Sequence, residues 1–178
     1  MKMTRFPKKS LFSLVVLSLL APTFAFAMGS GDKFVDAQTG RTYGIYKPSN
    51  TLNLKLHTFQ SLLCTAGKEQ WVAVSYGTGK KKLDIYETMA GDKCSDPGLS
   101  KTLASTTING ARAVVHVYCD PMNAQAFKAC GTKDIARVGG FLMFTTKAKK
   151  NLKATEIQVQ GIGGITYQEL IAVAKALK

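Results

Sequence analysis

Two histidines and four cysteines are the residues of this chain whose side chains could carry chemistry. Two imidazoles assisted by a lysine can cleave RNA by general acid–base catalysis, and a basic chain suits that substrate. A small secreted nuclease or hydrolase that uses His116 and His57 is therefore one hypothesis. In the other interpretation, each histidine is a hydrogen-bonded packing residue of a strand. We favour packing and expect no catalytic residue, since no Gly-X-Ser-X-Gly elbow or other catalytic motif accompanies them.

The four cysteines can form two disulfides in three ways. In an antiparallel hairpin, opposite residues have a constant index sum, which is near 158 for the turn that the sequence predicts around Gly79. The numbers of Cys64 and Cys94 sum to 158, so these residues are expected to face each other at the open end of that hairpin. Cys119 and Cys130 then close a second, shorter loop.

A redox or metal site is the competing interpretation of the cysteines. The sequence contains no Cys-X-X-Cys, and the spacings between successive cysteines are 30, 25 and 11 residues. Structural zinc sites normally have at least one close pair of ligands, so no metal site and no cofactor are expected. Residues 161–164 (GIGG) precede a predicted helix but lack the Lys-Ser/Thr of a phosphate-binding loop. They are predicted to form a plain strand-to-helix turn.

Positive charge is the second chemical feature of the chain. There are 24 Lys and Arg against 11 Asp and Glu, a formal net charge of +13, and removing the four basic residues among the first 27 leaves +9. A field of this sign favours an anionic envelope component as partner; nucleic acid is the less expected anion, and a protein partner stays open. The lysines are either solvated surface residues or contacts for an anion. Two clusters are the candidate anion-binding sites: Lys80, Lys81 and Lys82, and Lys147, Lys149, Lys150 and Lys153.

The first 27 residues are typical of a secretory signal peptide. The stretch 11–20 is apolar but only about half as long as a membrane-spanning helix. Ala25 and Ala27 are the small residues that a signal peptidase reads, which predicts cleavage after Ala27 by a Sec-type pathway. The n-region is positive and free of acids, with basic residues Lys2, Arg5, Lys8 and Lys9. We therefore expect a bacterial protein that is periplasmic or secreted.

Residues 28–178 are 151 residues long, the size of one domain with a single core. No further segment is apolar and long enough to span a membrane. Exported domains of this size are frequently stabilised by disulfides. The sequence therefore predicts one exported domain with two structural disulfides.

Strands dominate the predicted elements. The alternating leucines of residues 52–59 favour a strand, although Leu52, Leu56, Phe59 and Leu63 also fit a helical period. Residues 70–77 and 83–89 are rich in aromatic and β-branched side chains, and the glycines between them predict a hairpin. The other expected elements are a turn over 36–40, strands over 41–46, 111–118, 140–146 and 155–160, a two-residue turn at Asn109-Gly110, and a helical turn within 122–129.

A helix is predicted over residues 166–177. Thr166 and Glu169 have the spacing of a capping box, and the apolar residues that follow occupy one face. Because strands outnumber helices, the expected class is α+β: an antiparallel sheet with the C-terminal helix packed on one face.

From about Tyr76 onward, the order of motifs resembles a loose family of bacterial extracytoplasmic domains of unknown function, often attached to anti-sigma-type regulators. The shared positions are Tyr76-Gly77-Thr78-Gly79, Asn109-Gly110-Ala111, Phe141-Leu142-Met143-Phe144, Glu169-Leu170-Ile171, Ala174 and Leu177. The resemblance implies an antiparallel sheet with a docked helix and transfers no catalytic residue.

The leading functional hypothesis is a non-enzymatic exported domain that binds a partner or an envelope component through its surface. It rests on export, disulfides and positive charge. The alternatives are the small nuclease or hydrolase described above and a polyanion-binding protein, whose affinity would fall steeply with salt.

Overall fold

The computed structural model describes residues 29–94 and 96–178. The predicted signal peptide and its cleavage site lie outside the described residues. None of the helices in these two segments is long and apolar enough to cross a membrane.

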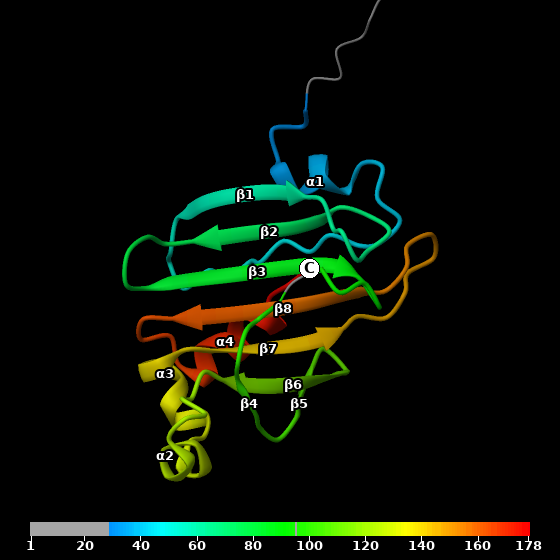
Figure 1. The fold of residues 1–178 in the computed structure, drawn as a ribbon. Coiled ribbons are helices and arrows are strands. Elements are labelled where there is room, and N and C mark those ends of the chain that lie inside the picture. Colours follow the sequence, from blue (N-terminus) through cyan, green and yellow to red (C-terminus); the bar gives the residue numbers. More distant parts are fainter. Residues whose placement is uncertain (1–28, 95) are drawn as a thin grey trace, which may run out of the picture.

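One eight-stranded antiparallel sheet organises the chain, with the order β1-β2-β3-β8-β7-β6-β4 and with β5 also paired to β6 (Figure 1). The strands are β1 (Leu56–Leu62), β2 (Trp71–Tyr76), β3 (Lys82–Met89), β4 (Lys101–Thr102), β5 (Thr106–Ile108), β6 (Ala111–Val117), β7 (Gly140–Thr145) and β8 (Thr155–Ile162). The helices are α1 (Lys33–Gln38), α2 (Ala124–Ala129), the 3-10 turn η1 (Thr132–Asp134), α3 (Ile135–Val138) and α4 (Tyr167–Lys175). The predicted α+β class is confirmed.

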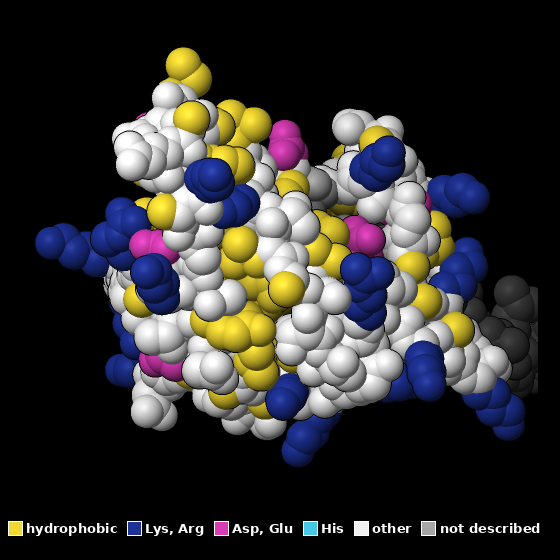
Figure 2. Space-filling view, turned by 90° about the horizontal axis from the view of Figure 1, so that it is seen from below, with side chains coloured by type: hydrophobic (Ala, Val, Ile, Leu, Met, Phe, Trp, Pro, Cys, Tyr) yellow, Lys and Arg dark blue, Asp and Glu magenta, His cyan; other side chains and the backbone are white. Residues whose placement is uncertain are grey.

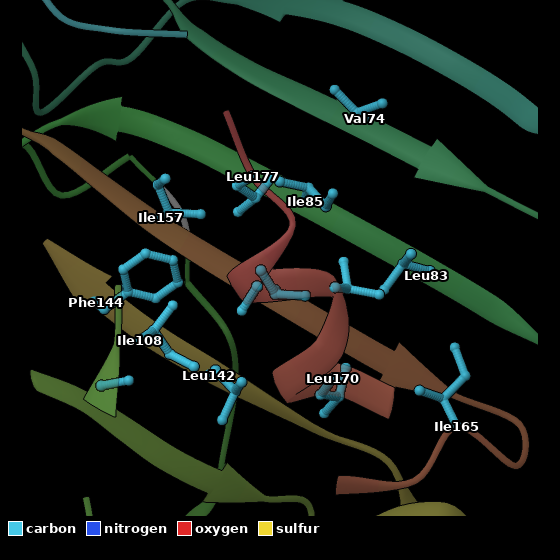
Figure 3. Packing of buried hydrophobic residues seen from close by; sticks show 14 of the residues in the cluster. Val74, Leu83, Ile85, Ile108, Leu142, Phe144, Ile157, Ile165, Leu170 and Leu177 are labelled. Atoms are coloured by element: carbon cyan, nitrogen blue, oxygen red, sulfur yellow. The ribbon is translucent and has the colours of Figure 1, made fainter. Parts of the chain in front are cut away.

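Helix α4 packs on one face of the sheet and lies behind it in Figure 1. Alternate strand residues point to this face, so Ile85 lies opposite Val74 on β2 and Val159 on β8. Figure 3 shows strand side chains such as Leu83 and Leu142 gathered around α4. Each large side chain buried in this way stabilises the fold by about 1.5–3 kcal/mol. The fully buried members of this core include Val72, Val74, Leu83, Ile85, Val115, Leu142, Ile157, Val159, Leu170 and Val173.

Both predicted hairpin turns are present. In the first, Tyr76 pairs with Leu83, which gives an index sum of 159, one away from the predicted value. In the second, Ile108 pairs with Ala111, and the two residues between them have left-handed φ angles of 48° and 81°. An Asn-Gly pair adopts these angles at low cost, which makes it the common sequence of a two-residue hairpin turn.

The predicted disulfide pairing is confirmed. Cys64 is bonded to Cys94 with a Cα–Cα distance of 5.0 Å, and Cys119 to Cys130 with a distance of 6.5 Å. The first bridge joins the chain after β1 to the chain after β3, and the second closes the loop that carries α2.

Helix α2 has no buried residue, yet it is firmly attached to the sheet edge. The ammonium group of Lys101 on β4 donates hydrogen bonds of 2.8 Å to the carbonyl oxygens of Phe127, Lys128 and Cys130. These are carbonyls at the end of the helix, where backbone acceptors lack partners within the helix. Lys101 and the Cys119–Cys130 bridge together hold this corner.

The N-terminal segment differs from the prediction. The expected turn over 36–40 lies at the end of α1, whose N-cap Asp32 accepts a hydrogen bond from the backbone of Phe34 at 3.0 Å. The expected strand over 41–46 is wrong, because the segment makes only an isolated parallel bridge, from Tyr43 to Lys153, and several of its other backbone groups bond to side chains. Gln38 binds the Tyr43 carbonyl and the Ile45 N–H, at 2.9 and 2.8 Å.

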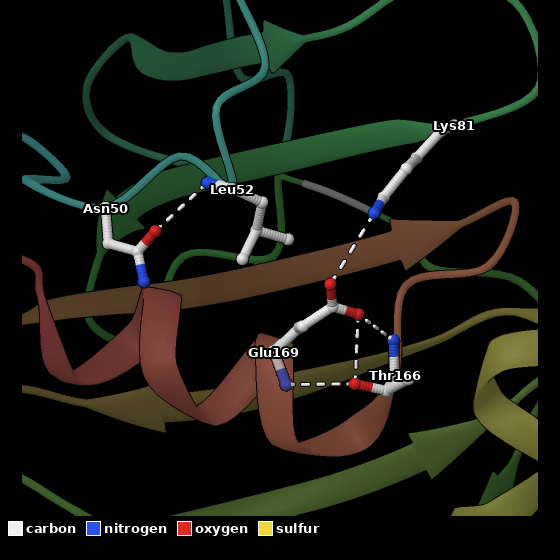
Figure 4. Close-up of polar contacts among 5 residues, drawn as sticks. All are labelled: Asn50, Leu52, Lys81, Thr166 and Glu169. Atoms are coloured by element: carbon white, nitrogen blue, oxygen red, sulfur yellow. Dashed lines mark hydrogen bonds and ion pairs between the residues drawn. The ribbon is translucent and has the colours of Figure 1, made fainter.

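The strand predicted over residues 52–59 begins later, at Leu56. Leu52 and Asn53 have left-handed φ angles of 57° and 59°. The side-chain oxygen of Asn50 accepts a 3.0 Å hydrogen bond from the Leu52 N–H and closes this turn (Figure 4). The leucine alternation therefore reflects packing of a turn and a strand, and the helical alternative is wrong.

Candidate functional site

The two histidines lie on different strands of the sheet. His57 is on β1 and His116 on β6, and these strands are five steps apart in the sheet order. With about 4.8 Å between neighbouring strands, the separation is on the order of 24 Å. One substrate cannot meet both imidazoles at that distance, so the structure does not assemble the two-histidine site.

His116 has the environment of a packing residue. Its ring stacks on Phe141 with centroids 4.3 Å apart and planes within 3°. Its Nδ1 lies 3.2 Å from the hydroxyl oxygen of Ser100. Burial lowers the pKa of His116 below its usual value, because the surroundings disfavour the charged imidazolium.

The first lysine cluster lies at the turn between β2 and β3 and is largely paired with the protein's own acids. Lys81 lies 3.5 Å from the carboxylate of Glu169 on α4 (Figure 4), and Lys82 lies 3.1 Å from Asp84. Asp84 is nearly fully buried. Lys80 is exposed. Two of the three predicted anion-binding lysines are thus already neutralised.

The glycine run before α4 serves close packing. A Cβ on Gly163 would lie 1.5 Å from the backbone oxygen of Lys80, and one on Gly161 would contact Ile165 at 2.7 Å. At the helix start, Thr166 and Glu169 form the predicted capping box, and the Thr166 backbone hydrogen bond is the main cause that lowers the pKa of Glu169. This carboxylate occupies the place that an anion would take.

The second lysine cluster lies at the turn between β7 and β8, at the opposite end of the sheet (Figure 1). The ammonium of Lys149 lies 4.7 Å from the ring centroid of Tyr46. Lys153 is tied to the N-terminal segment by its backbone N–H, which donates to the Thr42 carbonyl at 2.7 Å. Among the described residues, Lys147, Lys149 and Lys150 have no ion-pair partner.

A pocket of about 220 Å³ opens beside this turn. Its floor is apolar and belongs to the core, since Ile108 and Ile157 are fully buried and Phe144 is 5% exposed. Two lysines of the second cluster stand at its rim, and we call it the lysine-rimmed pocket. Its lining residues are Tyr46, Ile108, Asn109, Ala111, Phe144, Thr146, Lys147, Ala148, Lys149, Ile157 and Leu177.

Hydrogen bonds from distant parts of the chain fix the pocket walls. The side chain of Asn109 donates to the carbonyl of Lys175 at 3.2 Å, which joins the β5–β6 turn to the end of α4. Leu177 is held in place by an isolated antiparallel β-bridge to Pro48 of the N-terminal segment. Figure 3 shows Leu177 on the same side of the sheet as Ile108, Phe144 and Ile157.

The Tyr46 wall rests on a buried carboxylate. Both carboxylate oxygens of Glu87 accept hydrogen bonds from the Tyr46 N–H, at 3.2 and 3.0 Å. Glu87 is fully buried, and the loss of hydration raises its pKa to about 8, although the Tyr46 hydrogen bond and the charge of Arg41 act in the opposite direction. Glu87 is therefore mostly protonated at neutral pH.

The remaining positive charge is dispersed. Figure 2 views the molecule from the β4–β6 edge and shows Lys and Arg side chains scattered around that face, with hydrophobic surface between them. In residues 29–94 and 96–178, no group of three or more His, Cys, Asp or Glu side chains could hold a metal ion. In the lysine-rimmed pocket, two lysines that have no ion-pair partner among the described residues line an apolar cavity.

Compared with known proteins, the chain matches no family model, no curated protein and no solved structure. The interpretation of the pocket therefore depends on its own geometry.

Sequence analysis identified the pocket's lysines but not its floor. Tyr46, Ile108, Phe144 and Leu177 are far apart in the sequence and meet only through the sheet register and the docked C-terminus. The available signal was the Asn109-Gly110 turn, which fixes where β6 begins and thus which residues line the pocket.

Proposed function

We propose that this protein is an exported, disulfide-stabilised binding domain that takes up an anionic component of the bacterial envelope in the lysine-rimmed pocket. The observation that carries the proposal is the position of Lys147 and Lys149 at the mouth of an apolar cavity. Apolar walls with a few placed polar groups are the usual composition of a ligand site.

Export is supported by the predicted signal peptide and by the two disulfides, because such bonds persist in oxidising compartments. The nuclease hypothesis loses its geometric basis, since His57 and His116 lie far apart on the sheet. The volume of the pocket fits a small apolar group of a ligand and is too small to receive the surface of a protein partner.

The export half of the proposal is tested by fractionating bacteria that express the full chain. We expect the periplasmic protein to begin at Met28 and to react with no alkylating agent before reduction. An unprocessed cytosolic chain with free thiols would contradict export.

The binding half is tested by calorimetry with three anionic probes, a short-chain phosphatidylglycerol, lipopolysaccharide and octanoate, and with a short-chain phosphatidylcholine as the neutral reference. We expect at least one anionic probe to bind and the double variant Lys147→Gln/Lys149→Gln to weaken it by about tenfold or more. Lys80→Gln/Lys128→Gln removes the same net charge from exposed positions elsewhere and should leave binding unchanged. Equal losses in both double variants, or no binding at all, would refute a binding site at the pocket.

A further inference from the structure

We infer that the ligand of the lysine-rimmed pocket is a medium-chain monocarboxylate, with its hydrocarbon end inside the pocket and its carboxylate at Lys147 and Lys149. This inference rests on the proposed function and adds the chemical class of the ligand.

The cavity sets the size of the hydrocarbon part. An apolar cavity of about 150 Å³ accepts one benzene molecule, so about 220 Å³ holds a somewhat larger group, such as a short aliphatic chain. The floor formed by Ile108, Phe144 and Ile157 offers such a chain no hydrogen-bond partner. Ligand selection at this depth is therefore by apolar contact, which favours an unsubstituted hydrocarbon.

The rim sets the charge of the head group. Among the lining residues there are two lysines and no acid. Lys149 is held beside the pocket because its ammonium lies 4.7 Å from the Tyr46 ring centroid, within the range of a cation–π contact. A cationic ligand would be repelled, and a neutral one would gain nothing from these charges.

The rim also favours one negative charge over several. It contains no arginine, whose planar fork is the usual bidentate partner of phosphate groups. Two of the neighbouring backbone donors are already used, since the Lys149 N–H bonds to the Leu152 carbonyl and the Thr146 N–H to the Thr155 carbonyl, at 3.0 and 2.8 Å. Two ammonium groups without a guanidinium beside them match a single carboxylate.

The test is an NMR titration of the isotope-labelled protein with octanoate, with octan-1-ol and octylamine as probes of the same length. We expect octanoate to shift the methyl signals of Ile108, Ile157 and Leu177 and to bind more tightly than either reference. Along the series butanoate, hexanoate, octanoate and dodecanoate, affinity should rise about fourfold per methylene until the pocket is full, and then level off.

Two single variants form a matched pair. Lys149→Gln should weaken octanoate binding about fivefold, whereas Lys150→Gln, in the same turn but outside the pocket lining, should leave it unchanged. Ala111→Leu should block binding by filling the cavity. If Ala111→Leu fails to fold, the comparison of Lys149→Gln with Lys150→Gln and the methyl shifts still test whether octanoate binds in the pocket.

Tighter binding of octylamine or octan-1-ol, shifts confined to other surfaces, or equal effects of Lys149→Gln and Lys150→Gln would overturn the inference. If octanoate does not bind while phosphatidylglycerol or lipopolysaccharide binds in a Lys149-dependent way, the carboxylate assignment fails and the proposed function stands. If octanoate binds but the chain stays unprocessed in the cytosol, the proposed function fails as an export claim.

Discussion

At the end of the sheet where β2 turns into β3, lysines are paired with acids of the fold, and the β8–α4 turn packs tightly beneath them. At the other end, where β7 turns into β8, lysines stand without acidic partners beside a cavity. Both clusters look alike in the sequence. The comparison teaches that neighbouring acids, here Asp84 two residues along β3 and Glu169 brought in by α4, decide whether a lysine cluster is available to a ligand.

The tightly packed end should be the more sensitive to added volume. Gly163→Ala places a Cβ against the Lys80 carbonyl at a left-handed φ of 72°, and we expect the free energy of unfolding to fall by about 4 kcal/mol. Gly164 has a φ of 90° but open space around it, so Gly164→Ala should cost about 1 kcal/mol from backbone strain alone. Urea denaturation measures both. Equal losses in the two variants would show that strain, and not contact with the hairpin, determines the effect.

Each end of the sheet also has one disulfide, and the rings differ in length. Replacing Cys64 and Cys94 with alanine, at the pocket end, removes a bridge across a sequence separation of 30 and should cost about 3.7 kcal/mol. Replacing Cys119 and Cys130, separated by 11, should cost about 2.8 kcal/mol. Thermal unfolding of both variants tests the order. A reversed order would mean that the longer bridge does not constrain the unfolded chain as assumed.

The buried carboxylate behind the pocket wall should make stability depend on pH. Because the pKa of Glu87 is about 8 in the folded protein and near 4.5 when unfolded, the folded state binds more protons between these values. The contribution of Glu87 to the free energy of unfolding is therefore complete below about pH 4.5 and is lost as the pH rises toward 8. At pH 7 the loss is about 3 kcal/mol.

Glu87→Gln keeps an acceptor for the Tyr46 N–H and removes the titration. The variant should thus become more stable relative to the wild type as the pH rises over this range, as measured by chemical denaturation at several pH values. A constant difference would contradict a raised pKa.

The smallest expected effect concerns the lysines themselves. Lys81→Gln removes a partly exposed ion pair with Glu169 and should lower stability by about 0.5 kcal/mol. Lys149→Gln removes no ion pair and should change stability less, while it weakens ligand binding. Denaturation of both variants at low and at high salt provides the comparison, since the Lys81 effect alone should shrink with salt. If both variants lost the same amount of stability, with the same dependence on salt, the two lysine clusters at the ends of the sheet would not differ in pairing.

Local patterns predicted most of this fold. The hairpin around Gly79, the Asn109-Gly110 turn and the capping box at Thr166 are each specified by residues within a few positions of one another, and all three are present. The disulfide pairing followed from the first of these through its register.

The errors fall where long-range contacts replace local ones. Residues 41–46 resemble a strand, but their backbone makes one isolated bridge to Lys153 and otherwise bonds to side chains such as those of Gln38 and Glu87, which no local pattern indicates. Helix α1 is similar, because its buried Phe34 packs edge-to-face on Phe59 of β1 at 5.0 Å. The pocket floor was missed for the same reason. The resemblance to extracytoplasmic domains stays a prediction.

The attachment of α2 has a consequence for how this chain can be altered. The segment between Cys119 and Cys130 is held from outside by the sulfur bridge and by the Lys101 ammonium, and Phe127 is the α2 side chain that packs against the core. Its exposed positions are therefore free to vary as long as Phe127 is kept and the helical end presents its carbonyls to Lys101. This corner is the natural place to graft a reporter or an epitope without disturbing the sheet.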